Sequence, residues 1–163
     1  MSWDAIITRG EAGEESIGPY VEVARWVTDF WQVADWDYFV SQDGARFEIM
    51  LRTALDEAKW EFLDAHPTPS DPAQLPNYRK AIQWFEPKPT TPVTYISVSV
   101  RSGSDPLPSL KRFCAVHGLS LLDSQLGEFV DVHDNSPAEM DSFREWRAFR
   151  NSLTDGRSGI ESD

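Results

Sequence analysis

Hydrophobic and polar residues alternate most regularly along the stretch from Val93 to Arg101. Ile96, Val98 and Val100 share one side of this stretch, and serines occupy much of the other side. Alternation with a period of two is typical of a β-strand that buries one face. The same reasoning, with turns expected at 41–44 and 124–127, predicts further strands near 3–8, 36–41, 45–52, 119–123 and 128–132.

Other segments repeat their apolar residues at intervals of three and four, as amphipathic helices do. One such segment runs from Tyr20 to Trp31 and follows Pro19, which suits a first helical position. A second follows Thr53 and Asp56, which form a capping-box sequence. Two more helices are predicted, from Pro106 to His117 with Asp105 as N-cap and Gly118 at the C-terminal end, and from Pro137 to Leu153 behind the capping box of Ser136 and Glu139.

The segment 66–92 interrupts this order of strands and helices. Seven prolines surround one short helical patch at Tyr78–Phe85, and proline favours turns and loops over long elements. We interpret the segment as an excursion from the core. The whole pattern predicts a single α+β domain over 1–153, with a mostly antiparallel sheet, helices packed on one face, and a flexible acidic tail at 154–163.

Composition restricts the classes of partner. Asp and Glu outnumber Lys and Arg by 27 to 15, so the chain carries a formal charge of -12. Such a field repels nucleic acid and anionic lipid and attracts basic protein surfaces. The single cysteine excludes an internal disulfide framework, and the sequence shows no zinc-ligand spacing, export signal or membrane-length apolar run. We therefore expect a cytoplasmic protein without a cofactor and without nucleic-acid or membrane partners.

Two acidic segments favour docking to a basic protein, although the same acids also suit a solubilising surface. Residues 27–45 contain four Asp and no Lys or Arg, with Trp and Tyr between them. Residues 113–145 contain Arg144 as their single Lys or Arg. Charge of one sign accelerates association with an oppositely charged partner. The predicted partner-binding residues are Asp35, Trp36, Asp37, Asp43, Glu128, Asp131 and Asp134.

The reactive side chains define no catalytic arrangement. Cys114 falls on the apolar face of its helix, which predicts a buried structural thiol. His117 lies beside the helix end, where it is placed to interact with the last carbonyls. Asp131 and His133 share a strand face, but one His near carboxylates is commonplace and does not establish a metal site. The carboxylates Glu48, Asp123, Glu128 and Asp131 match no hydrolase spacing, so we predict neither catalytic residues nor a metal.

Several short segments carry a resemblance. They are Met-Ser-Trp-Asp at 1–4, Val-Arg-Ser-Gly-Ser-Asp at 100–105, His-Gly-Leu-Ser-Leu-Leu-Asp at 117–123 and Gly-Glu-Phe-Val-Asp at 127–131. Together with a Trp before an acidic hairpin, they resemble small acidic bacterial proteins, some encoded beside toxins, that are grouped as immunity proteins. The resemblance covers 1–9, 36–52 and 93–131.

The resemblance implies a protein that binds a bacterial toxin and neutralises it by occluding a basic active-site surface. A nuclease or nucleotide-using toxin would fit, because such an enzyme needs positive charge to hold phosphate. The residues alone leave two alternatives open. One is a small hydrolase or metal-dependent enzyme, and the other is a generic acidic interaction module or nucleic-acid mimic.

Overall fold

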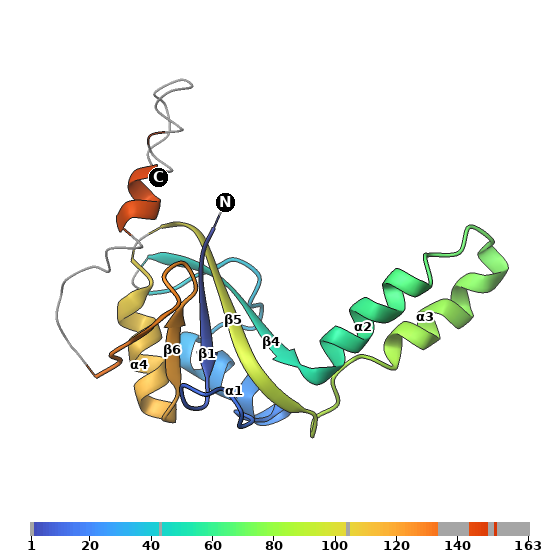
Figure 1. Cartoon of the computed structure of the whole chain (residues 1–163), viewed down its shortest axis with the longest axis horizontal. Helices are drawn as coiled ribbons and strands as arrows, with labels where there is room; N and C mark the ends of the chain where they lie inside the picture. Colours follow the sequence, from blue (N-terminus) through green and yellow to red (C-terminus); the bar gives the residue numbers. More distant parts are fainter. Residues whose placement is uncertain (1, 43, 104, 134–143, 150–151, 153–163) are drawn as a thin grey trace.

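An antiparallel sheet forms the centre of the fold (Figure 1). The computed structural model describes residues 2–42, 44–103, 105–133, 144–149 and 152. The strands lie in the order β3-β4-β5-β1-β6-β7, and β2 extends the line of β1 by pairing with β5. Their bounds are β1 Trp3–Thr8, β2 Gly18–Pro19, β3 Phe39–Val40, β4 Ala45–Thr53, β5 Pro92–Gly103, β6 Ser120–Asp123 and β7 Glu128–Val130.

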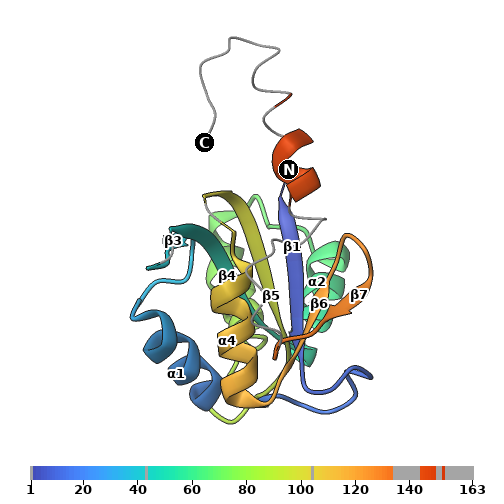
Figure 2. The same cartoon turned by 90° about the vertical axis from the view of Figure 1, so that its left-hand side faces the viewer.

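The helices divide into two groups. Helices α1 (Tyr20–Trp31) and α4 (Leu107–His117) cover one face of the sheet. An arm is inserted in the chain between the end of β4 and the start of β5. It consists of helix α2 (Ala54–Ala65), the short 3-10 helix η1 (Pro72–Gln74) and helix α3 (Leu75–Gln83). Figure 2 shows α1 and α4 in front of the sheet and α2 behind it. The predicted α+β class, with a mostly antiparallel sheet and helices against one face, is confirmed; the arm departs from that layer.

Strand alternation builds the core. Trp3, Ala5 and Ile7 of β1 are buried, and so are the alternate residues of β4 and β5 that point to the same face. Aromatic rings fill the space beneath the helices. The Trp31 ring stacks on Phe113 with centroids 4.8 Å apart and meets further rings edge-on. Trp146, within the helical residues 144–149, is also buried in this core.

The opposite side of the sheet is not covered by α1 or α4, and we call it the uncovered face. Ser99 lies between Glu48 and Asp4 in the strand register, and Ser97 lies between Met50 and Ile6. The Ser99 hydroxyl donates a hydrogen bond of 2.6 Å to Asp4 Oδ1. The described side chains of this face are Asp4, Ile6, Thr8, Val40, Arg46, Glu48, Met50, Arg52, Tyr95, Ser97, Ser99, Arg101, Ser120, Leu122 and Phe129.

Local signals account for several element boundaries. The capping box of Thr53 and Asp56 is present, with both side chains bonded to backbone N–H groups. Gly118 ends α4 with φ 66°, a left-handed conformation that glycine adopts without strain. The excursion expected at 66–92 is longer than predicted, because the arm already begins with α2 at Ala54. The Ser136/Glu139 capping box and the tail at 154–163 lie outside the described residues.

Two strand predictions were too long. The strand expected at 36–41 is limited to Phe39–Val40, because the Asp37 N–H donates to Asp35 Oδ1 at 3.0 Å and closes a turn instead of continuing the sheet. The strand expected at 128–132 ends at Val130. There, the His133 N–H donates to Asp131 Oδ1 at 3.0 Å in a similar turn.

Candidate functional site

Part of the predicted partner-binding set meets at one edge of the sheet. Asp35, Trp36 and Asp37 follow the end of α1 and line a groove of about 550 Å³ together with residues of β4. Sequence analysis expected 36–41 and 45–52 to flank one turn, but it did not include Glu48 among the partner-binding residues. We call this concavity the acidic groove, and its lining residues are Ala34, Asp35, Trp36, Asp37, Glu48, Ile49 and Met50.

Two hydrogen bonds fix the groove wall. The Ile49 N–H donates to the Trp36 carbonyl at 3.0 Å and ties the loop to β4. The Trp36 indole N–H donates to Thr28 Oγ1 at 3.3 Å and ties the same residue to α1. Trp36 is partly buried against the core, so it supports the groove and presents only part of its ring. The wall is therefore held by both the sheet and the helix layer.

Asp37 and Glu48 place two carboxyl groups close together in the acidic groove. Burial raises the pKa of Glu48, and a hydrogen bond and the negative charge of Asp37 raise it further. Arg101 and Arg52 act in the opposite direction but do not cancel these effects. Two ionised carboxylates at one site repel each other, which disfavours the charged form. An arriving cation would relieve the repulsion, so the groove suits a Lys or Arg side chain better than an anion.

Tyr38, the residue after Asp37, has an uncommon backbone conformation. Its φ is 51°, a left-handed value that is rare for a bulky residue. The Arg101 guanidinium lies over the Tyr38 ring, 4.6 Å from its centroid. Burial raises the pKa of Tyr38, and the charge of Glu48 adds to that rise. Such conformations persist where surrounding contacts enforce them, and here they place Asp37 against Glu48.

The remaining predicted acids lie elsewhere. Glu128 and Asp131 are exposed at and beyond β7, on the opposite edge of the sheet from β3. Five interstrand spacings, roughly 24 Å, separate these two edges. The structure therefore does not bring the two acidic segments together into one cluster. Asp43 and Asp134 lie outside the described residues.

The surroundings of the candidate reactive residues suit structural roles. Cys114 is fully buried as predicted, and burial raises the pKa of its thiol to about 12. His117 lies in the last turn of α4, its ring stacks on that of Trp26 with centroids 4.5 Å apart, and burial lowers its pKa. Buried Asp123 accepts hydrogen bonds from backbone N–H groups in the β6–β7 turn.

Among the described residues, no group of three His, Cys, Asp or Glu side chains is arranged to hold a metal ion. None of the helices in the described ranges combines the length and apolar composition that crossing a membrane requires.

Sequence reasoning missed the two most exposed tryptophans. Trp60 on α2 is 66% exposed, and Trp84 just after α3 is 72% exposed. The signal was present for Trp60, because it falls outside the apolar stripe formed by Leu55, Ala58 and Phe62. It also missed the contact between Tyr38 and Arg101, which joins residues far apart in the sequence.

Comparison of this sequence with models of protein families, with curated proteins and with solved structures gave no match.

Proposed function

We propose that this chain is a non-enzymatic binding protein that neutralises a basic bacterial toxin, as an immunity protein does. The observation that carries the proposal is the acidic groove, where Asp35, Asp37 and Glu48 line one concavity beside partly apolar walls. A Lys or Arg side chain needs carboxylates for its head and apolar surface for its stem. Trp36 and Met50 supply that apolar surface.

The mechanism is occlusion of the toxin's basic surface. A toxin that acts on nucleic acid or nucleotides presents Lys and Arg to phosphate, and the same groups would enter the acidic groove. The charge of -12 would steer the encounter, and contacts inside the groove would slow dissociation. Raising the salt concentration should therefore slow association more than it accelerates dissociation.

The test starts from the genes that neighbour this one: a toxin gene found among them is co-expressed with this chain in a bacterial host, and affinity is then measured on the purified pair. Asp37→Lys should weaken the complex by about thirtyfold or more, because it places a cation against the toxin's cation. Asp131→Lys makes the same charge change at the opposite sheet edge and should weaken it by only about threefold. Equal effects of the two variants, or toxicity that this chain does not relieve, would contradict the proposal.

An enzyme is the second candidate, because the Glu48 and Asp37 carboxyls form the kind of pair that performs acid–base chemistry. Hydrolysis would need one carboxyl protonated and the other ionised, and the raised pKa of Glu48 favours Glu48 as the protonated one. The variants Glu48→Gln and Asp37→Asn distinguish the two functions. An enzyme would lose turnover in both variants, whereas a binding protein would have no turnover to lose.

A further inference from the structure

Helix α2 presents one solvent-facing stripe of acidic and aromatic side chains. Glu57, Trp60, Glu61 and Asp64 are all exposed, and they repeat at the i, i+3, i+4 and i+7 positions of one helix face. We call these four residues the Trp60 stripe. The stripe combines a large aromatic side chain with three carboxylates and contains no Lys or Arg.

Folding of the arm does not use the Trp60 stripe. The opposite side of α2 contacts α3 and the residues after it through Phe62, whose ring centroid lies 6.1 Å from that of Tyr78 and 5.4 Å from that of Phe85. Lys59 adds an ion pair of 3.7 Å with Glu86. A tryptophan left two-thirds exposed contributes little to burial, and exposed aromatic residues are frequent anchors of protein interfaces. The exposure of Trp60 therefore favours contact with a partner protein over packing in the interior of this chain.

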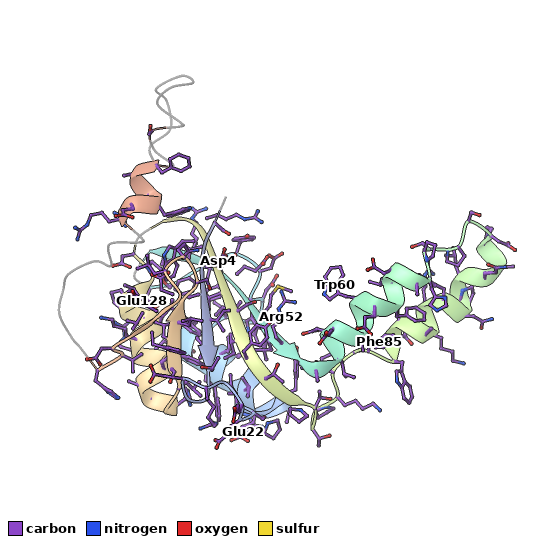
Figure 3. The ribbon with its side chains drawn as sticks, in the orientation of Figure 1. Asp4, Glu22, Arg52, Trp60, Phe85 and Glu128 are labelled. Carbon is purple, nitrogen blue, oxygen red and sulfur yellow. The ribbon has the colours of Figure 1, made fainter. Side chains whose placement is uncertain are left out.

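The arm places this stripe toward the uncovered face. Figure 3 shows Trp60 rising from α2 into the region between the arm and the sheet, on the side from which Arg52 projects. Met50 and Tyr95 on the uncovered face are 41% and 38% exposed and add apolar surface. Arg52 is held within its own sheet, because its Nε donates to Ser97 Oγ at 3.4 Å. The stripe and the uncovered face thus front the same region of solvent.

We propose that the Trp60 stripe docks a basic amphipathic helix of the partner protein. Apolar side chains of that helix would pack on Trp60, while its Lys and Arg residues pair with Glu57, Glu61 and Asp64. Charge complementarity selects this occupant, since the stripe carries negative charge only. The inference rests on the proposed function and adds a second contact to the acidic groove.

The same charges oppose a second copy of this chain as the occupant. Two Trp60 stripes facing one another would bring the carboxylates of both copies together, which disfavours association. Trp84 provides a matched control on the same arm. It is at least as exposed as Trp60, but it lines a separate pocket of about 340 Å³ with Ala54 and Pro92, and Lys88 Nζ lies 5.3 Å from its ring centroid.

The experiment uses the full chain labelled with 5-fluorotryptophan and a synthetic amphipathic helix made of Lys and Leu. A peptide of the same composition in scrambled order and a Glu/Leu helix are the control probes. The fluorine resonance that Trp60→Phe removes should shift with the Lys/Leu helix and stay fixed with both controls. Trp60→Ala should weaken binding by about tenfold or more, as for an interface anchor. Trp84→Ala should change it by less than about threefold.

Three results would overturn the inference. The first is equal binding of the ordered and scrambled peptides, which indicates charge attraction without docking. The second is an affinity that Trp60→Ala leaves unchanged. The third is a wild-type dimer that Trp60→Ala dissociates in sedimentation, which makes a second copy the occupant. Each of these results leaves the acidic groove intact, because Asp37→Lys and the toxin test that site separately.

Discussion

The sheet body and the arm use aromatic residues in opposite ways. In the body, the rings of Trp31 and Phe113 stack within a buried core. In the arm, Trp60 and Trp84 remain in solvent while Phe62 joins the two helices. Helices α2 and α3, which are fully described, contain no residue as buried as the core residues of the body. Burial accounts for the tryptophans of the body, none of which is among the exposed large hydrophobic residues, so the two exposed tryptophans of the arm are the better indicators of function.

The arm also depends on its own local contacts for stability. Isolated helices shorter than about 12–15 residues are marginal in water, and α3 has nine residues. The capping box of α2 and the rings around Phe62 therefore hold the arm together. The body stabilises only the base of the arm, where Ala54 and Leu55 meet Pro92 and Thr94 around a pocket. This difference predicts that the arm opens locally without unfolding the body.

Replacing a phenylalanine with alanine should lower the free energy of unfolding much more in the body than in the arm. Phe113→Ala removes a fully buried ring and should lower the global free energy of unfolding by about 3–5 kcal/mol. Phe62→Ala removes a partly buried ring and should cost about 1–2 kcal/mol, expressed as opening of the arm. Urea denaturation measures the first effect, and amide hydrogen exchange at 54–86 measures the second. Similar global losses in both variants would show that the arm and body unfold as one unit.

Local sequence signals were sufficient for much of the fold. The alternation along β5, the capping box at Thr53 and the glycine at 118 each act over a few residues, and all three were confirmed. The acidic groove was only partly predictable. Asp35 and Asp37 stood out by charge, whereas their meeting with Glu48 depends on the turn at Tyr38 and its contact with Arg101.

The direction of the arm was also beyond sequence reasoning. Proline content marked an excursion, but the apolar stripe of α2 is equally suited to packing on a sheet or on a second short helix. The structure shows that α3 and the residues after it supply that partner, through Tyr78 and Phe85. Tertiary contacts that join distant residues decided this outcome.

Replacing the arm with a linker should change the body's free energy of unfolding by less than Phe113→Ala changes it. The change should also be smaller than the loss of arm stability in Phe62→Ala. A short Gly-Ser linker in place of 56–86 keeps the segment before β5 that meets the start of α1, where the N–H groups of Tyr20 and Val21 donate to the carbonyls of Thr91 and Pro89. The body should then unfold cooperatively with a free energy within about 1 kcal/mol of the intact chain, because loop closure changes little with length. Circular dichroism during urea titration measures this value. A molten or unfolded product would mean that the arm is part of the body's cooperative unit.

The smallest expected effect concerns the acidic groove itself. The folded-state pKa of Glu48 is raised, first by burial and then by Asp37, so the folded protein binds this proton more tightly than the unfolded chain. That contribution favours folding fully below the ordinary glutamate pKa and is lost as the pH rises through the raised value. Above the raised pKa, the ionised Glu48 is therefore unfavourable to folding.

Glu48→Gln should accordingly stabilise the protein at neutral pH by about 0.5 kcal/mol or less, since solvent screens this partly exposed group. The gain should disappear as the pH falls below the ordinary glutamate range. Thermal denaturation across that pH range measures it, with Glu128→Gln on exposed β7 as the control for removing one charge. A gain equal to that of the control would show that Asp37 does not strain Glu48. A stability gain larger than that of the control, together with weaker toxin binding, would show that the two carboxylates of the groove lower stability and strengthen binding of a cationic partner.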